Sequence, residues 1–197
     1  HCSGLDIVID IAITPNRPDA LGVRGIARDL AAKGLGELKS VAIPKVKGTF
    51  KSPVSIHLDR DVITKECPVF IARYIRGVKN RESPKWLQER LIAIGLRPIS
   101  ALVDITNFIT YDRARPLHVF DAAKLDGELT VRKARAGEHV IALDGDDYSL
   151  GPDDTVISSG GHIESIAGII GGMNSGCSIT TKDIIVESAY FDPIATA

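Results

Sequence analysis

The apolar and polar positions at the start of the chain predict a strand followed by a helix. Residues 5–13 alternate strictly, with leucine or isoleucine at every odd position and Asp6 and Asp10 on the opposite face, which is typical of a half-buried strand. Prolines in the following segment 14–19 end it, because they remove backbone donors and fix the chain direction. A helix is then predicted over roughly residues 20–33, with Gly34 as its C-terminal stop.

The next part of the chain predicts a linker and two short strands. Residues 34–53 hold glycines and prolines among lysines, a composition typical of a linker between two units. Residues 54–58 are strand-like, and residues 70–78 predict another strand edged with arginines.

Two helices are predicted in the middle of the chain. Ser83 and Pro84 are typical of a helix start, and apolar residues recur at helical spacing through about Ile94. Residues 100–112 are ambiguous, because their β-branched content favours a strand. The helical spacing of the apolar residues within them favours a helix, which is the prediction we adopt.

Beyond residue 128 the pattern turns to β-structure. Asp144-Gly145 and the segment 159–161 are typical of hairpin turns. The predicted strands cover residues 129–134, 140–143, 148–150, 155–158, 162–166 and 184–188. The predicted fold class is therefore α+β, with a β-rich, mixed-sheet or barrel-like domain that carries a few short helices and follows a strand-helix segment of a small first domain.

Composition and charge narrow the classes of protein to which this chain can belong. The 197 residues carry a net charge of −1, so no global field draws in nucleic acid. No apolar run is long enough to span a bilayer, and three cysteines far apart fit neither a disulfide framework nor a zinc site, so a reducing cytoplasm is the simplest setting. Local basic patches are candidates for RNA contact or are solvated faces beside a core: Lys45, Lys47 and Lys51; Arg73, Arg76 and Lys79; Arg132, Lys133 and Arg135.

Four features are candidates for chemistry, and two of them lie in the middle of the chain. In Asp104–Asn107 three polar groups lie within one turn of an otherwise apolar element, although Thr and Asn in such a place are usually satisfied internally. His118 lies between apolar neighbours, where a lone histidine is more often a hydrogen-bonded core residue than a catalyst. The other histidines show no spacing with it that indicates a metal site.

The other two features lie near the end of the chain. The segment 167–172 is rich in glycine but lacks the residues of a phosphate-binding loop or a dinucleotide fingerprint. Its glycines either let a ligand approach the backbone or mark a tight chain crossing. Glu187 points the same way as Ile185 in a predicted strand, so it lies either on a solvent face or in a pocket as a specificity group, because burial without a partner is costly. No nucleophile elbow, carboxylate pair or metal constellation is visible.

Taken in order, seven segments resemble the beta chain of bacterial phenylalanyl-tRNA synthetases. Residues 10–20 are similar to the signature near the end of that family's first, discontinuous domain. The segments similar to its editing domain are 95–99, 103–107, 115–121, 143–145, 167–172 and 187–193. Each is weak alone, but seven in order are specific, and together they cover nearly the whole chain.

The resemblance implies an organisation and a set of partners. Residues 1–38 would end the first domain, residues 39–53 would form a linker, and residues 54–197 would form a C-terminally truncated editing domain, so we expect the chain to be a fragment. The family's enzyme is a cytoplasmic α2β2 tetramer whose alpha chain joins phenylalanine to tRNA(Phe) with ATP and Mg²⁺. Its beta chain hydrolyses tyrosine wrongly attached to that tRNA, with no cofactor for editing and no membrane partner.

The resemblance also implies roles for six residues. By position, Thr106, Asn107 and His118 would form the catalytic set, and Glu187 would recognise the tyrosine hydroxyl. Ala167 and Gly168 would form a wall of the pocket. A synthetic site for phenylalanine cannot strongly reject an analogue that adds one hydroxyl, so a second, hydrolytic site is useful, and a buried acceptor there would be left unpaired by phenylalanine.

Two departures and two rival interpretations remain open. The family usually has Gly-Gln where this chain has Ala114-Arg115, so the loop entering His118 is expected to differ slightly. The family's pocket also continues beyond the last residue here, so an isolated fragment without activity is one expected outcome. The rivals are a structural or RNA-docking module without hydrolysis, and a stand-alone relative that clears mischarged tRNA in trans, against which the segment 10–20 argues.

Overall fold

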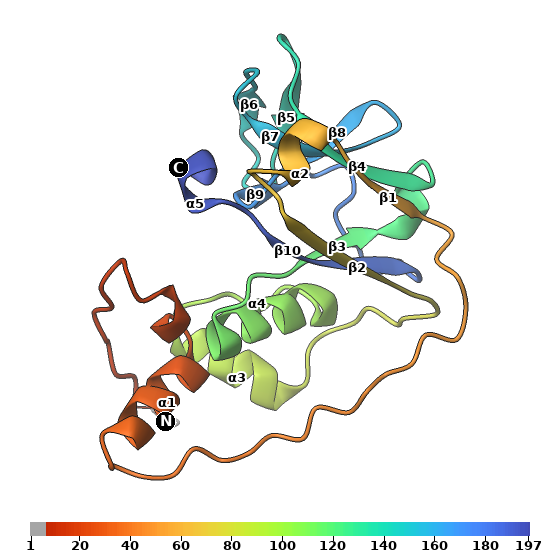
Figure 1. Cartoon of the computed structure of the whole chain (residues 1–197). Helices are drawn as coiled ribbons and strands as arrows, with labels where there is room; N and C mark the ends of the chain where they lie inside the picture. Colours follow the sequence, from red (N-terminus) through yellow and green to blue (C-terminus); the bar gives the residue numbers. More distant parts are fainter. Residues whose placement is uncertain (1–6) are drawn as a thin grey trace. The chain divides into compact units, whose positions relative to one another are not determined.

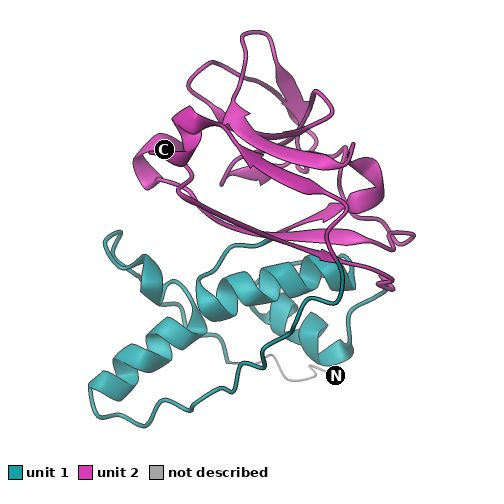
Figure 2. Ribbon diagram, turned by 45° about the vertical axis from the view of Figure 1, so that its right-hand side comes forward, with its two compact units in different colours: residues 1–50, 81–117 teal, residues 51–80, 118–197 magenta. Residues whose placement is uncertain are grey.

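The computed structural model describes residues 7–197, which form two compact units (Figures 1 and 2). Unit 1 contains the described part of residues 1–50 together with residues 81–117, and unit 2 contains residues 51–80 and 118–197. Each unit therefore draws on two separate stretches of the chain. The two units are defined by packing alone. They do not test the domain boundaries expected from the sequence, which stay a prediction.

Unit 1 is helical. Its elements are the 3₁₀ turn η1 (Pro18–Ala20) and the helices α1 (Val23–Ala32), α3 (Lys85–Ala93) and α4 (Ala101–Arg113). Helices α3 and α4 pack through Trp86 and Phe108, whose rings meet edge to face with centroids 5.6 Å apart. Leu87 and Leu91 on α3 are buried. The apolar spacing in α3 and α4 thus places a shared core between them.

The structure confirms the three helices that were predicted to begin near residues 20, 83 and 100. The ambiguous segment 100–112 is helical, as its apolar spacing favoured. The first helix begins at Val23, because the residues just before it form the separate turn η1, which contains Pro18.

The buried carboxylate of Asp104 fastens the start of α4. Its side chain accepts hydrogen bonds from the backbone N–H of Ile99 at 2.9 Å and from the hydroxyl of Ser83 at 2.5 Å. Asp104 is only 1% exposed, so both bonds compensate for its removal from water. The first polar residue of the segment Asp104–Asn107 is therefore structural.

The strand predicted over residues 5–13 is wrong for residues 7–13, while residues 5 and 6 lie outside the described residues. Residues 7–13 form neither helix nor strand, and Ile7 and Ile9 are 92% and 75% exposed. A strand is stable only when a neighbour satisfies its backbone groups, and alternation of side chains does not supply one. Among residues 7–197 no strand pairs with this segment.

Unit 2 contains three sheets, labelled in Figure 1. A five-stranded sheet has the order β1-β4-β7-β8-β9, a three-stranded sheet the order β2-β10-β3, and β5 pairs with β6. The strands are β1 (Ser55–Leu58), β2 (Val69–Ile75), β3 (His118–Asp121), β4 (Glu128–Lys133), β5 (His139–Ile141), β6 (Asp147–Ser149), β7 (Thr155–Ser159), β8 (His162–Ile166), β9 (Ile170–Gly171) and β10 (Ile184–Tyr190). The short helices are α2 (Arg60–Ile63), η2 (Ala122–Lys124) and α5 (Pro193–Thr196).

The mixed α+β class predicted from the sequence is confirmed. Strand β1 runs parallel to β4, whereas the other pairs are antiparallel. Both predicted hairpins are present, β5–β6 around Gly145 and β7–β8 around Gly160. Asp192 caps α5, since its side chain accepts hydrogen bonds from two backbone N–H groups of that helix. The two-residue strand β9 and the strand β3 that begins at His118 were not predicted.

The core of unit 2 faces the inner side of the three-stranded sheet. Strand β10 alternates, so Ile185 is buried on the inner side and packs with Phe120 of β3 and with Leu129 and Ile157 of the larger sheet. Tyr74 of β2, opposite Ile185 in register, packs against the same cluster. Residues in register with Ile185, or two positions along β10 from it, therefore point into this core.

One predicted basic patch is occupied by ion pairs. The guanidinium of Arg132 donates to both carboxylate oxygens of Glu138, at 2.7 and 2.8 Å, and its side chain is only 9% exposed. Lys133 lies 2.6 Å from the carboxylate of Glu66. These two cations stabilise unit 2, so the interpretation of this patch as an open RNA contact is not supported for them.

Helix α4 ends at a residue with left-handed backbone geometry. Ala114 has φ 52° and ψ 38° and caps the helix, and it is the only non-glycine residue with positive φ between residues 7 and 197. An L residue pays roughly 1–2 kcal/mol for this geometry, which glycine adopts freely. The departure at Ala114-Arg115 noted in the sequence therefore has a local physical consequence.

Ala114→Gly is expected to stabilise the chain by about 0.5–1 kcal/mol, because the relief of backbone strain exceeds the added entropy of the unfolded chain. Urea unfolding followed by far-ultraviolet circular dichroism measures the change. Ala31→Gly in α1 is the control and should instead destabilise by about 1 kcal/mol. A loss of stability in both variants would contradict the strain at Ala114.

Candidate functional site

The candidate site is built on a cross-strand pair in unit 2. In the register of β10 with β3, Glu187 lies directly opposite His118. Residues opposite one another in an antiparallel pair point to the same face of the sheet, with Cβ atoms about 5 Å apart. Because Glu187 is two residues from the buried Ile185, both side chains point to the inner face of the three-stranded sheet.

Glu187 is a buried carboxyl group that is not in an ion pair. It is 7% exposed, and no hydrogen bond or salt bridge to its side chain is found among residues 7–197. Its neighbours are apolar or weakly polar: Ala72 lies opposite it on β2, and the buried thiol of Cys67 is close enough for the Glu187 charge to raise the thiol pKa in addition to burial. Burial raises the pKa of Glu187 to about 7.

His118 is held by packing. Its ring meets Phe120 edge to face with centroids 4.4 Å apart, and it lies over the backbone of Gly171. A Cβ added at Gly171 would come within 2.8 Å of Nε2 of His118, so the glycine leaves the space that the imidazole fills. Nε2 is buried and has no hydrogen-bond partner within the described chain, and burial lowers the pKa of His118 to about 4.

Ala167 and Gly168 form the turn between β8 and β9. Ala167 is buried in the same core cluster as Ile185 and donates its N–H to the carbonyl of Thr155 at 2.9 Å. Gly168 has φ 74°, and a Cβ there would lie 2.9 Å from the ring of Phe191. Glycine is therefore required by both backbone geometry and space. Both residues share unit 2 with His118 and Glu187.

Thr106 and Asn107 lie on α4 in unit 1. The Thr106 hydroxyl donates to the carbonyl of Val103 at 2.7 Å, so this group is satisfied within its own helix, which is the structural alternative. Asn107 is half-buried, and its side-chain amide makes no hydrogen bond among residues 7–197. The structure therefore assigns four of the six candidate residues to unit 2 and these two to unit 1.

Sequence reasoning missed the residues that shape the site. Gly171 was part of a glycine-rich stretch whose meaning was left open, and Phe120 was only a neighbour in the His118 motif. Cys67 gave no signal, because a lone cysteine carries none. These residues adjoin the pair through sheet pairing and chain crossing, which a local pattern does not reveal.

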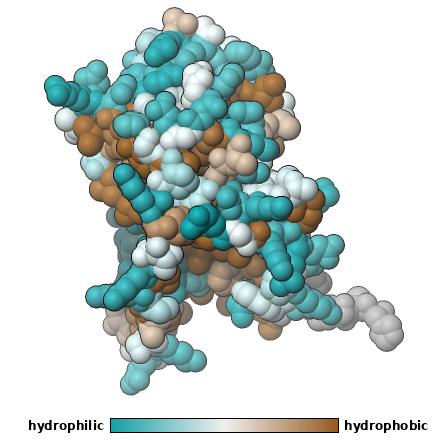
Figure 3. All heavy atoms as spheres, turned by 90° about the vertical axis from the view of Figure 1, so that its right-hand side faces the viewer, coloured by the Kyte–Doolittle hydropathy of each residue, from teal (hydrophilic) through white to brown (hydrophobic). Residues whose placement is uncertain are grey.

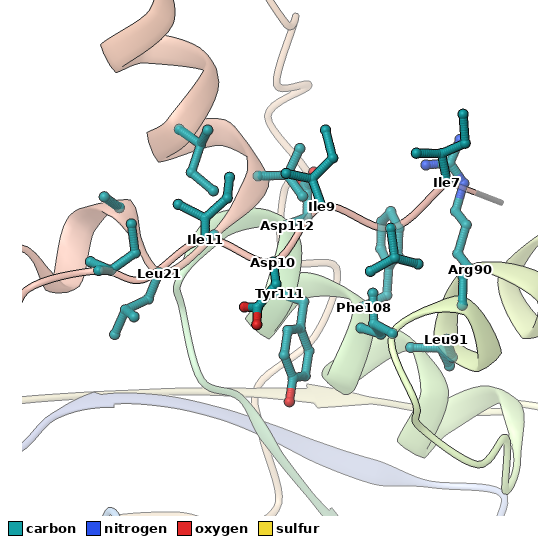
Figure 4. Close-up of a pocket in the computed structure, with 18 residues that line it drawn as sticks. Ile7, Ile9, Asp10, Ile11, Leu21, Arg90, Leu91, Phe108, Tyr111 and Asp112 are labelled. Atoms are coloured by element: carbon teal, nitrogen blue, oxygen red, sulfur yellow. The ribbon is translucent and has the colours of Figure 1, made fainter.

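A larger cavity than any at the pair lies elsewhere, within unit 1, among the cavities found between residues 7 and 197. It has a volume of about 620 Å³, and Figure 4 shows the segment 7–13, α3 and α4 around it. Its lining is mostly apolar and includes none of the six candidate residues. It is an exposed apolar surface of unit 1 and supplies no chemistry of its own.

Metal binding and a membrane-spanning helix are not supported by the described residues. Between residues 7 and 197 no three side chains of the His, Cys, Asp or Glu types are grouped so as to hold a metal ion. No helix in that range combines the length and the apolar character needed to cross a membrane. The described groups at the pair are a neutral imidazole and a carboxyl group poised between its two protonation states, which can accept hydrogen bonds and transfer protons.

Glu187→Gln is expected to stabilise the chain at pH 8 by at most about 3 kcal/mol, because the pKa of Glu187 rises from 4.5 to about 7 on folding. The cost of the buried charge is absent below about pH 4.5 and complete above about pH 7, so the gain should vanish on acidification. Urea unfolding at pH 5 and pH 8 measures it.

Glu138→Gln is the matched control with the opposite sign. Hydrogen bonds from Arg132 lower the pKa of Glu138, so its charge contributes stability at pH 8, and the variant should be destabilised there. Equal effects of the two substitutions at pH 8 would contradict the unpaired burial of Glu187.

Comparison with known proteins gives two kinds of match. Residues 66–197 match the model of the B3/4 domain. The phenylalanine–tRNA ligase beta subunit of Mesorhizobium japonicum is 59% identical over 98% of this chain, and that of Cereibacter sphaeroides is 56% identical over 98%. The chain spans 24% of the length of each of these relatives.

A solved structure supports the fold. An N-terminal fragment of the phenylalanyl-tRNA synthetase beta subunit from Pyrococcus horikoshii aligns with a TM-score of 0.55 and 16% identity, covering 91% of this chain and 54% of that one. At this identity the likeness concerns the fold alone. The chain belongs to the B3/4 domain family, and nearly its whole length matches a segment of phenylalanine–tRNA ligase beta subunits.

Proposed function

We propose that this chain carries the editing site that hydrolyses tyrosine wrongly esterified to tRNA(Phe). The observation that carries the proposal is Glu187, a buried acceptor without a partner in the described chain, directly opposite a half-buried histidine whose Nε2 is buried. Such an acceptor is costly unless a ligand pairs with it. The tyrosine hydroxyl is the one group that distinguishes the wrong product from the right one, and it is a donor.

Discrimination follows from this single hydrogen bond. The tyrosine hydroxyl donates a hydrogen bond to the carboxylate of Glu187. This bond recovers part of the free energy that the carboxylate lost on burial. Phenylalanine fills the same space but leaves the acceptor unpaired. A site built to bond a hydroxyl discriminates by about 10⁴-fold against an analogue that lacks it.

The chemistry is attack of water on an ester. The water oxygen bonds to the ester carbonyl carbon while a water proton passes to Nε2 of His118, with the ring proton on Nδ1. The bond from that carbon to the ribose oxygen then breaks, and the ribose oxygen takes up the proton, releasing tyrosine and tRNA. The low pKa of His118, about 4, keeps the ring neutral near pH 7, so Nε2 can accept a proton, and it also makes the imidazole a weaker base than one with a pKa near 7.

The other candidate residues have positioning roles in this proposal. Thr106 and Asn107, which belong to unit 1, have only the role in placing water and substrate that the family resemblance implies, and Asn107, whose side-chain amide makes no hydrogen bond within the described chain, is the better candidate of the two. Ala167 and Gly168 form the wall, with backbone N–H groups near Gly168 stabilising the developing oxyanion. The longer protein would act in the cytoplasm as an α2β2 ligase with the alpha chain, tRNA(Phe), ATP and Mg²⁺.

Glu187→Ala in the intact synthetase should abolish most of its preference for Tyr-tRNA(Phe) over Phe-tRNA(Phe), by at least about 100-fold, because the hydroxyl loses its acceptor. Hydrolysis of the two preformed aminoacyl-tRNAs measures this. Glu164→Ala is the control, since Glu164 is also buried on a strand of unit 2 but already accepts from the Asn174 amide. A wild type that leaves Tyr-tRNA(Phe) intact would favour the structural or RNA-docking alternative.

His118→Ala should slow hydrolysis of Tyr-tRNA(Phe) by about 100-fold or more, because the step loses its base. His162→Ala, at an exposed position of β8, is the control and should retain the rate. If His118→Ala kept the full rate, the role of this residue would be wrong, and water alone or a tRNA hydroxyl would have to carry the proton.

A further inference from the structure

An exposed apolar surface adjoins the candidate site. Large hydrophobic side chains reach the surface of the chain between hydrophilic ones (Figure 3). Three of them lie on neighbouring segments of unit 2: Ile141 is 50% exposed, and Leu143 and Met173 are each 54% exposed. We call these three residues the apolar shelf.

Backbone pairing places the shelf residues on one face. Ala142 and Gly172 form an antiparallel bridge, so Ile141 is opposite Met173 and Leu143 is opposite Gly171. Backbone hydrogen bonds of 2.9 Å from Met173 N–H to the Ile141 carbonyl and from Leu143 N–H to the Gly171 carbonyl confirm this register. Residues opposite one another, or two apart on a strand, share a face.

The same face carries His118. The space above Gly171, where a side chain would start, is filled by the His118 ring, and Leu143 is the cross-strand neighbour of Gly171. Leu143 thus neighbours the residue over which the imidazole lies, and Glu187 is opposite His118 on β10. From neighbour to neighbour, the series is therefore Glu187, His118, Gly171 and then the shelf.

This order matches the order of groups in the proposed substrate. A tyrosine esterified to a terminal nucleoside has its hydroxyl at one end, the ester in the middle and the ribose and base at the other end. With the hydroxyl at Glu187 and the ester at His118, the next group along is the nucleoside. A flat base suits an apolar surface, since base stacking tolerates any π face.

The negative charge around the apolar shelf disfavours binding of a tRNA phosphate group there. Residues 136–181 contain no lysine or arginine but seven acidic residues, including Asp144, Asp146 and Asp147 beside the shelf. A phosphate would be repelled there, whereas an uncharged base would not. The exposed carboxylates also offer acceptors to an exocyclic amine.

We propose that the shelf formed by Ile141, Leu143 and Met173 binds the base of the terminal nucleoside of the aminoacyl-tRNA, as a subsite beside His118. The inference rests on the proposed function, because it takes the tyrosyl ester to lie at His118. It adds a contact that free tyrosine does not make.

The test uses the intact synthetase and three probes in isothermal titration calorimetry. The probes are free tyrosine, tyrosine joined by a non-hydrolysable amide to 3′-amino-3′-deoxyadenosine, and the same amide on a ribose without a base. Wild type should bind the adenosine amide about 5- to 100-fold tighter than the abasic amide. The double variant Leu143→Ser/Met173→Ser should lose most of that difference and bind tyrosine as wild type does.

The control and the contrary outcomes separate the two proposals. Ile63→Ser, on α2 and 45% exposed, should leave all three affinities unchanged. Equal affinity of wild type for the adenosine and abasic amides, or an unchanged difference in the double variant, would overturn the subsite, while tyrosine binding that Glu187→Ala weakens would uphold the site at Glu187. Tyrosine binding that Glu187→Ala leaves unchanged in the intact synthetase would overturn both.

Discussion

The pairing of β10 with β2 on one side and β3 on the other is the constraint on which the rest of unit 2 depends. It orients Ile185 into the core, and the same alternation then forces Glu187 inward two residues later. A slip of one residue would expose Ile185 and free the carboxylate at once. Hydrophobic burial along one strand thus holds in place a charge-bearing group that water would otherwise stabilise.

Two polar groups on the inner face of the three-stranded sheet have no partner among residues 7–197, which sets them apart from the other buried charged groups. Elsewhere in the described chain buried charges have partners: Asp104 accepts two hydrogen bonds, and Arg132 and Glu138 form a bidentate pair. At Glu187 and at Nε2 of His118 the described chain supplies no such partner. Unpaired groups of this kind are costly and persist where a function selects them.

The sequence predicted elements whose stability is local and missed those that depend on distant partners. Helix α4 follows from apolar spacing, and the β5–β6 hairpin follows from Asp144-Gly145. Residues 7–13 have an ideal strand pattern but no partner, so they form no strand. The candidate site divides in the same way, because Glu187 could be singled out as an odd group in a strand, whereas Gly171 acquires its importance only through contact with the His118 ring.

Charge explains how recognition of a nucleic acid fits a chain with a net charge of −1. Phosphate contacts provide affinity without selectivity, whereas contacts to the amino acid and base provide selectivity. In unit 2, Arg132 and Lys133 form ion pairs with Glu138 and Glu66, and residues 136–181 contain no lysine or arginine. Under the proposed function, the surroundings of His118 therefore discriminate, and the phosphates must be bound by basic side chains elsewhere in the chain or in the longer protein.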